Sequence, residues 1–160
     1  MLEKELAGAV ITQIEESKDN QICVELYDSG ATCHISPYRS NFISYIPLIP
    51  PVFLNTANQQ QFPAIGHGTL AIQVPNGDRE TELTLHGALH APGISYTLVS
   101  LATLDEEGYH AHIGASHLKL ISSQGENVGC IAWTSRCLYK VVHALDSTNA
   151  IKPVSVMELH

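Results

Sequence analysis

Tyr27-Asp28-Ser29-Gly30-Ala31-Thr32 comes directly after a β-rich run, Ile22-Cys23-Val24-Glu25-Leu26, in which apolar residues take alternate positions. A strand that ends in Asp-Ser-Gly places a carboxylate on a tight turn. Gly30 permits close approach of backbone or ligand because it has no Cβ, and Ser29 can anchor the turn through its hydroxyl. Such a carboxylate can act as a general base towards water when a second carboxylate shares its proton. Taken alone, however, the triplet is ordinary turn chemistry, and its meaning depends on the rest of the chain.

Two further stretches give the triplet a context. The run from Leu26 to Ile35 holds the triplet and a following histidine, the run from Gly87 to Leu104 is similar to the pattern L-x-x-A/V-P-x-h-x-x-N-L-h-S-V-x-x-L, and the run from Gly125 to Val141 ends in C-L-Y-K-V. In this order the three resemble retropepsin-type aspartic proteases. The histidine, the middle pattern and the closing motif resemble the Copia-type (Pseudoviridae) retrotransposon subgroup in particular. Ser100 stands where retropepsins generally carry a glycine, as the Copia-type pattern itself has it.

The resemblance implies an all-β fold, a retropepsin-like acid protease barrel with one short helix, active as a symmetric homodimer. The protease domain is expected at residues 1–143 and a C-terminal tail at 144–160. Asp28 is the expected catalytic residue, in an active-site loop completed by Ser29, Gly30, Ala31 and Thr32. The expected substrate-binding flap has its tip at Asn55, Thr56, Ala57, Asn58, Gln59 and Gln60. An ordinary surface hairpin is the alternative interpretation of that last segment.

The chain carries one Asp-Ser-Gly motif and no visible repeat, whereas pepsin-type enzymes hold two such motifs in one chain. Because two carboxyls must share one proton, one motif per chain predicts that Asp28 of two subunits meets on a two-fold axis. The implied function is an aspartic endopeptidase of a Copia-type retrotransposon. It would cleave the element's Gag-Pol polyprotein without a cofactor, in the cytoplasm, within the element's virus-like particle.

Two alternatives stay open at this point. The chain could be a domesticated or degenerate protease-like domain that dimerises or binds peptide without catalysis. It could also be a generic β-barrel in which the Asp-Ser-Gly turn is a coincidence. An intact Asp28-Ser29-Gly30 triplet favours the enzyme.

Length and composition indicate one globular domain. The chain has 160 residues, of which 44% are hydrophobic and 15% charged, enough to form a core. The net charge is −8 and no basic run is present, which argues against a nucleic-acid surface because such surfaces need clustered Lys and Arg. No apolar run reaches the length of a membrane span and no signal-peptide pattern opens the chain. We therefore expect a soluble intracellular protein with no membrane partner.

Cysteine and histidine spacing predicts no metal site. Cys23, Cys33, Cys130 and Cys137 lack the short Cys-x-x-Cys spacing of structural zinc sites, so we expect reduced thiols, several of them buried. The nine histidines show no recurring ligand spacing. His110 and His112 could share one face of a strand, but zinc needs further ligands.

Local patterns predict most of the elements. Met1–Ala7 is expected as a loose helical turn or a frayed terminus, and Ala9–Ile14 as a strand that pairs with the run from Ile22. A short helix within Ser36–Phe42 would carry Phe42 inward. Three prolines make Ile46–Pro51 an extended connection.

Later in the chain, Asn76-Gly77 is a strong hairpin signal. Leu101–Gly108 is expected as a short helix that ends at the glycine. Further strands are expected at 109–113, 117–121, 128–132 and 137–142. Gly66-x-Gly68 lacks the third glycine, the following helix and the lysine of a phosphate loop, so we exclude that function.

Overall fold

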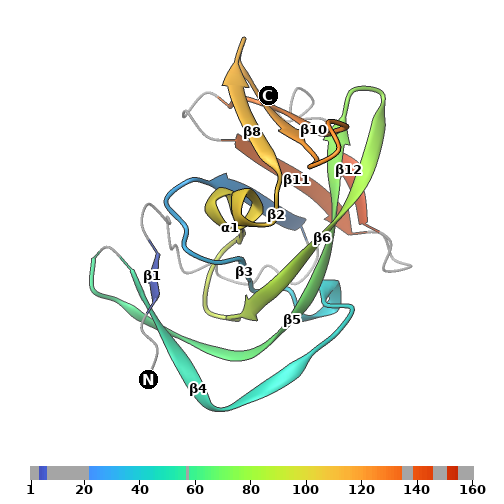
Figure 1. The fold of residues 1–160 in the computed structure, drawn as a ribbon. Helices are drawn as coiled ribbons and strands as arrows, with labels where there is room; N and C mark the ends of the chain where they lie inside the picture. The colour runs from blue at the N-terminus through green and yellow to red at the C-terminus, as the bar shows by residue number, and fades with distance from the viewer. Residues whose placement is uncertain (1–3, 7–21, 57, 135–138, 146–150, 155–160) are drawn as a thin grey trace.

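The computed structural model describes residues 4–6, 22–56, 58–134, 139–145 and 151–154 of the chain. Within these residues nearly all regular structure is β-strand, with one short α-helix and one turn of 3-10 helix (Figure 1). The elements in chain order are β1 (Lys4–Leu6), β2 (Ile22–Asp28), β3 (Ile35–Ser36), η1 (Arg39–Asn41), β4 (Ile46–Thr56), β5 (Gln61–Asn76), β6 (Arg79–His90), β7 (Thr97–Ser100), α1 (Leu101–Glu106), β8 (His110–Gly114), β9 (His117–Ile121), β10 (Asn127–Ala132), β11 (Tyr139–Leu145) and β12 (Ile151–Val154).

The strands of the described residues form two sheets. Nine strands form one sheet in the order β1-β4-β5-β6-β3-β7-β2-β11-β12, and β10-β9-β8 form a second sheet. The expected all-β class is confirmed. The expected barrel is not seen as a closed structure in this part of the chain, because β1 and β12 are the two edges of the large sheet and do not pair with each other.

The long β5–β6 hairpin supplies much of the main core. Leu70, Ile72 and Val74 alternate along β5 and are buried, and Leu83 and Leu85 alternate along β6 and pack beside them. This is the side-chain period of two that a half-buried strand requires. Gly77 adopts a φ of +67° in the turn, so the hairpin signal at Asn76-Gly77 is confirmed. A second cluster gathers around Ile35, Leu54 and Leu98, on the side of the active-site loop.

Helix α1 begins and ends where the sequence places it. The Ser100 side chain accepts the Thr103 N–H at its start. At its end, the Gly108 N–H donates to the Asp105 carbonyl and the Tyr109 N–H donates to the Leu104 carbonyl. This pair of bonds is a Schellman motif, and Gly108 takes the left-handed φ of +94° that the motif requires.

The proline-rich segment differs from its predicted form. Strand β4 runs unbroken through Ile46–Pro51, which we expected to be a connection. The ladder with β5 pairs Pro47 and then resumes at Val52, with a shift in register between them. The prolines at 50 and 51 therefore lie in the unpaired stretch, where a missing N–H removes no ladder bond.

The chain ends also differ from expectation. Lys4–Leu6 is a strand parallel to the end of β4, not a helical turn. In the predicted tail, β11 continues to Leu145 and Ile151–Val154 pairs with it as β12. The predicted strand at Ala9–Ile14 lies outside the described residues, as do Ala57 and Cys137. The predicted helix before Phe42 is confirmed as the 3-10 turn η1, and Phe42 is buried.

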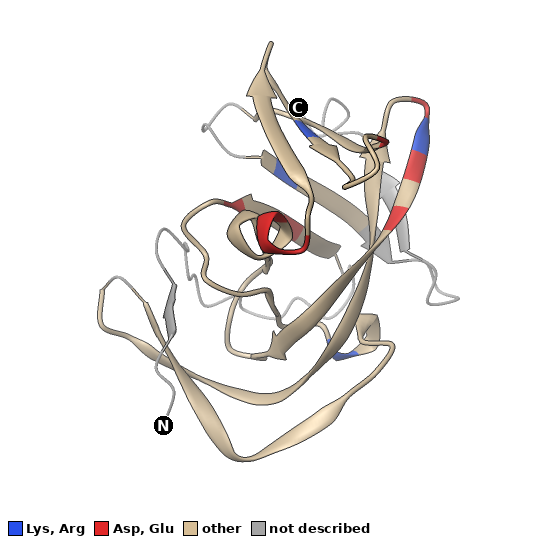
Figure 2. Cartoon of the chain, viewed as in Figure 1, with Lys and Arg blue, Asp and Glu red and all other residues tan. Residues whose placement is uncertain are grey.

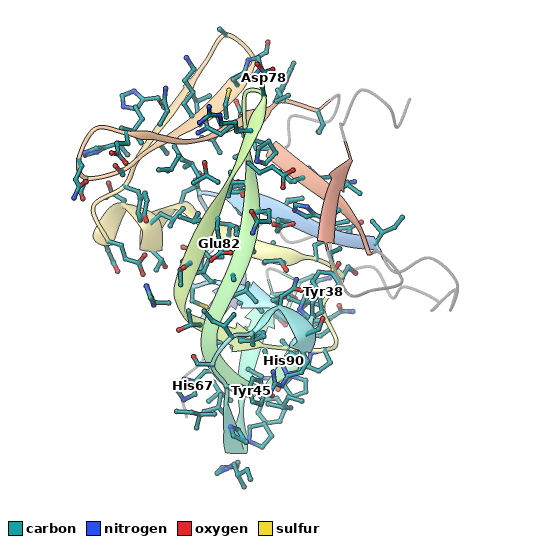
Figure 3. The ribbon with its side chains drawn as sticks, turned by 90° about the vertical axis from the view of Figure 1, so that its right-hand side faces the viewer. Tyr38, Tyr45, His67, Asp78, Glu82 and His90 are labelled. Atoms are coloured by element: carbon teal, nitrogen blue, oxygen red, sulfur yellow. The ribbon has the colours of Figure 1, made fainter. Side chains whose placement is uncertain are left out.

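Gly66 and Gly68 have a packing role. Tyr45 lies across β5 and its hydroxyl is 2.8 Å from His90 Nδ1; Figure 3 shows the two side chains near each other. A Cβ on Gly66 would overlap the Tyr45 ring, and a Cβ on Gly68 would overlap the Ser44 backbone carbonyl. The two glycines therefore let the segment before β4 approach β5 closely.

We predict that Gly68→Ala destabilises the domain by about 1–3 kcal/mol or more, because the new methyl group meets backbone that cannot rotate away. Gly114→Ala is the matched control, since no atom lies within 4 Å of the added Cβ. It should change stability by no more than about 0.5 kcal/mol. Urea denaturation of both variants measures the difference, and equal stabilities would contradict the packing role.

Candidate active site

Strand β2 carries Asp28 to the edge of the buried structure. It lies between β7, to which it is parallel, and β11, to which it is antiparallel. Its residues from Cys23 to Tyr27 are buried, Asp28 is partly exposed, and Ser29 and Gly30 are exposed. A rigid strand therefore presents the carboxylate at its end, as the sequence predicted.

The Asp-Ser-Gly triplet forms a tight turn. The Gly30 N–H donates a 2.7 Å hydrogen bond to Asp28 Oδ1. This Asx-type bond fixes one carboxylate oxygen against the backbone of the turn. After the turn the chain goes back inside, since Ala31 is buried while Thr32 is exposed.

Ser100, at the junction of β7 and α1, contacts the loop. Ser100 is the ladder partner of Asp28 in the parallel pairing of β2 with β7. The Ser100 hydroxyl donates to the Ala31 carbonyl over 2.7 Å. The sequence marks Ser100 only as a residue that stands where retropepsins generally carry glycine, and it does not predict this contact.

His34, just after the loop, makes a second contact with Ser100. Its ring is fully buried, and Nδ1 accepts a 3.0 Å hydrogen bond from the Ser100 N–H. Because a backbone N–H can only donate, Nδ1 carries no proton and the ring is neutral. Burial, with a smaller effect of His86, lowers the pKa of His34 to about 4. In the sequence this histidine is typical of a subgroup, and no local signal gives it a role.

The predicted flap segment is the tip of the β4–β5 hairpin. The Thr56 N–H donates to the Gln60 carbonyl and the Gln59 N–H donates to the Thr56 carbonyl, each over 2.9 Å. Asn58, Gln59 and Gln60 are exposed at this tip, and Asn55 pairs with Gln61 at its base. The hairpin itself is confirmed, and its action on a substrate stays a prediction.

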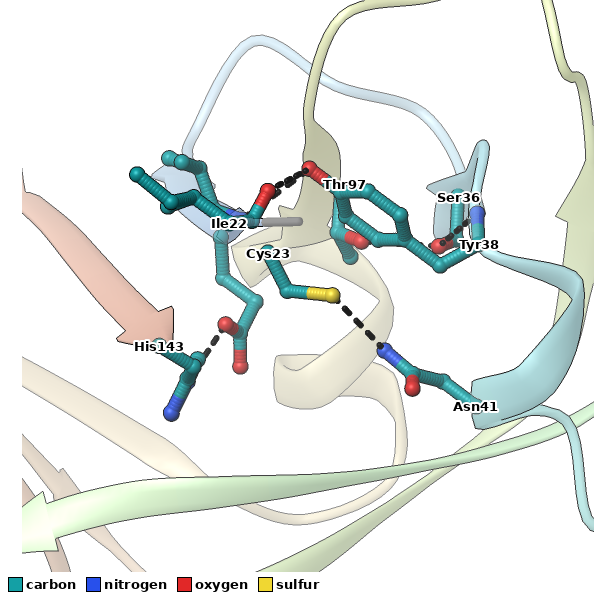
Figure 4. A network of polar contacts seen from close by, with 9 residues as sticks. Ile22, Cys23, Ser36, Tyr38, Asn41, Thr97 and His143 are labelled. Carbon is teal, nitrogen blue, oxygen red and sulfur yellow. Dashed lines mark hydrogen bonds and ion pairs between the residues drawn. The ribbon is translucent and has the colours of Figure 1, made fainter. Parts of the chain in front are cut away.

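A buried polar pair joins β2 to β11. Glu25 Oε2 is 2.6 Å from His143 Nε2, and both side chains are almost fully buried between β2 and β11 (Figure 4). Burial raises the pKa of Glu25, and contact with His143 opposes that shift in part. Along a strand, residues three apart point to opposite faces, so Glu25 cannot serve as the second carboxylate beside Asp28.

Other polar contacts surround this pair. Asn41 Nδ2 lies 4.0 Å from Cys23 Sγ, and the Tyr38 hydroxyl accepts the Val24 N–H over 3.0 Å. Burial raises the pKa of Cys23 to about 11 and that of Tyr38 to about 12. Both groups are therefore neutral at physiological pH. Cys23, Cys33 and Cys130 form no disulfide within the described part of the chain, and the first two are buried, as expected.

Charge is distributed unevenly over the surface. Residues 40–77 contain no Lys, Arg, Asp or Glu. Figure 2 shows the consequence, with acidic residues (red) on α1 and near the turn of the β5–β6 hairpin, and none along β4. Ile46 and Ile49 are nevertheless exposed on β4, Ile49 by 91%. This uncharged, partly apolar β4–β5 hairpin is called the neutral arm below.

Two other types of site are absent from the described ranges. The residues that the structure describes contain no group of three or more His, Cys, Asp or Glu side chains placed to hold a metal ion. In the same ranges no helix is long and apolar enough to cross a membrane.

Comparison with known families gives the chain an origin. Residues 26–109, which run from the end of β2 to just past α1, match the family "Pol polyprotein, beta-barrel domain". The chain belongs to this family. The match covers just over half of the 160 residues and includes the whole active-site loop, the neutral arm and Ser100. No curated protein sequence shows a significant match.

Membership of the Pol β-barrel family confirms the coarse part of the sequence interpretation. The chain derives from the Pol polyprotein of a retroelement. The Copia-type assignment, the protease activity and the dimer are finer statements and are taken up below as proposals.

We predict that stability falls as the pH is lowered from about 6.5 to about 4, in part because of His34. Its pKa is about 4 in the folded state against an ordinary 6.5, so the unfolded chain binds a proton first. The contribution of His34 to the free energy of unfolding is fully present above pH 6.5. It decreases by at most about 3 kcal/mol between pH 6.5 and pH 4.

His34→Asn is the diagnostic variant, because the amide oxygen can still accept the Ser100 N–H but does not titrate. Urea denaturation of the wild type and the variant at pH 7 and pH 4.5 gives the loss of unfolding free energy on acidification for each protein. The variant should lose less stability on acidification than the wild type. An identical loss in both proteins would show that His34 does not titrate in this range.

Proposed function

We propose that this Pol β-barrel domain is the aspartic endopeptidase of a Copia-type retrotransposon. The observation that carries the proposal is the placement of Asp28, whose carboxylate is presented on an exposed turn at the end of a buried strand. The chain that follows is fixed by two hydrogen bonds to Ser100, at the β7–α1 junction. Origin from a Pol polyprotein supports the proposal, because such polyproteins require a peptide hydrolase to process them.

The chemistry requires a second copy of the chain. One carboxylate cannot both take a proton from water and give one to the substrate, so Asp28 of two subunits would share one proton on a two-fold axis. One Asp28 would accept a proton from the attacking water, and the other would protonate the scissile carbonyl oxygen. When the tetrahedral species collapses, the Asp28 that took the proton from water gives it to the amide nitrogen, the other Asp28 takes a proton back from a hydroxyl of the tetrahedral species, and the C–N bond breaks.

The proposed substrate is the element's own Gag-Pol polyprotein, bound as an extended and mostly apolar segment. The exposed tip Asn58–Gln60 of the neutral arm would act as the flap. Residues 40–77 are uncharged, which suits contact with apolar peptide. The reaction would need no cofactor and would occur in the virus-like particle of the element, in the cytoplasm.

We predict that Asp28→Asn lowers cleavage of a Gag-Pol fragment by at least about a hundredfold, because the amide cannot exchange the required proton. The side-chain oxygen of the introduced asparagine can still accept the Gly30 N–H, so folding should be retained. Asp78→Asn, at the exposed β5–β6 turn, is the matched control and should cleave normally. Cleavage is followed on gels beside circular dichroism of each variant.

The two outcomes of that experiment separate the candidate functions. Loss of cleavage in Asp28→Asn alone supports the protease. Absence of cleavage by well-folded wild type at high protein concentration would instead favour a domain that dimerises or binds peptide without catalysis.

We also predict that excess Asp28→Asn suppresses wild-type activity. At a tenfold excess of the mutant, random pairing leaves only about a tenth of the wild-type subunits in wild-type pairs. The rate per wild-type subunit should fall accordingly, after co-refolding to ensure exchange. Titration of the mutant into a fixed amount of wild type measures the effect. A constant rate after co-refolding would exclude a dimeric active unit.

A further inference from the structure

Ser100 uses every hydrogen-bonding group of its side chain. It is fully buried at the end of β7, directly before α1. Its N–H donates to His34 Nδ1 over 3.0 Å, and its hydroxyl donates to the Ala31 carbonyl over 2.7 Å. The hydroxyl oxygen then accepts the Thr103 N–H at 3.1 Å and the Thr103 hydroxyl at 3.0 Å. A hydroxyl has one proton and two lone pairs, so these contacts fill its capacity.

These bonds join two separate parts of the chain at one residue. Ala31 belongs to the active-site loop, His34 follows two residues after its end at Thr32, and Thr103 belongs to the first turn of α1. Ser100 is also the ladder partner of Asp28. The same residue therefore lies beside the carboxylate, holds the loop that follows it and caps the helix behind it.

The location of the bonds determines which part of the loop stays free. The chain is fixed at Asp28 by the strand ladder and at Ala31 by the Ser100 hydroxyl. Only Ser29 and Gly30 lie between these two points, and both are exposed. With the hydroxyl removed, the next bond between Ser100 and this part of the chain is the one from its N–H to the His34 ring, three residues further on, and the Thr103 hydroxyl is 3.5 Å from the Thr32 carbonyl.

We propose that Ser100 is a positioning residue that sets the geometry of the Asp28–Ala31 turn. A glycine at this position, as retropepsins generally have, would supply the backbone N–H but neither the bond to Ala31 nor the side-chain helix cap. The effect on catalysis rests on the proposed protease function. The effect on the loop does not depend on it.

Ser100→Ala tests the proposal, because it removes the hydroxyl and leaves the backbone N–H. Amide hydrogen exchange at Gly30, Ala31 and Thr32 should become at least about tenfold faster. A residue that merely caps α1 would change exchange only in the first turn of the helix. Val74→Ala is the control, since it removes buried volume in the main core without touching the loop.

Cleavage kinetics provide a second measurement on the same proteins. In Ser100→Ala kcat should fall about 10–100-fold with KM nearly unchanged, because a small displacement of reacting groups costs rate more than binding. Ser100→Thr keeps a donor and an acceptor in place and should restore most of kcat. Val74→Ala, compared at a temperature where all variants are folded, should retain activity.

The two hypotheses fail in different ways. If wild type shows no Asp28-dependent cleavage, the protease function is wrong, and exchange at residues 30–32 alone decides the role of Ser100. Unchanged exchange at these amides in Ser100→Ala overturns the positioning role. If the wild type is active, a kcat of Ser100→Ala within twofold of the wild-type kcat also overturns the positioning role.

Discussion

The parallel pairing of β2 with β7 is the contact on which the site depends. It puts Asp28 beside Ser100, and thereby brings a loop near the start of the chain against a helix more than 60 residues later. Parallel neighbours cannot be joined by a tight turn. Here the intervening residues form β3 to β6, so the neutral arm and half of the buried residues of the main core are part of the connection itself. A change that moves β7 moves the Asp28 turn with it.

Features set by neighbouring residues were predictable from the sequence. The hairpin at Asn76-Gly77, the helix that ends at Gly108 and the strand before Asp28 each follow from residues within one element. The resemblance that pointed to Asp28 likewise used three runs, each of them continuous in the sequence. The contacts of Ser100 were not predictable, because its partners Ala31 and His34 lie 69 and 66 positions away. Serine is common before helices, and nothing local shows which carbonyl its proton will reach.

The same limit explains the misinterpreted segments. Three prolines in Ile46–Pro51 argue correctly against a fully paired strand, but they cannot show that β4 continues through an unpaired stretch. Sequence patterns assigned no role to Gly66 and Gly68, and the reason for glycine there is the approach of Ser44 and Tyr45. Glu25 lies on β2, and its burial against His143, far along the chain, has no local signal.

The uneven charge of the surface has a consequence for the response to salt. The net charge of −8 is carried outside residues 40–77, so dissolved ions screen repulsion between the α1 and β6 regions of neighbouring molecules. The neutral arm carries no charge, so ions have no repulsion to screen there. Its exposed side chains Ile46 and Ile49 contact solvent, and a contact between two molecules would remove them from water. Salts such as sulfate are excluded from the protein surface, and they therefore favour burial of these apolar side chains. Rising ionic strength therefore weakens what keeps molecules apart and, with such salts, favours contact through the arm.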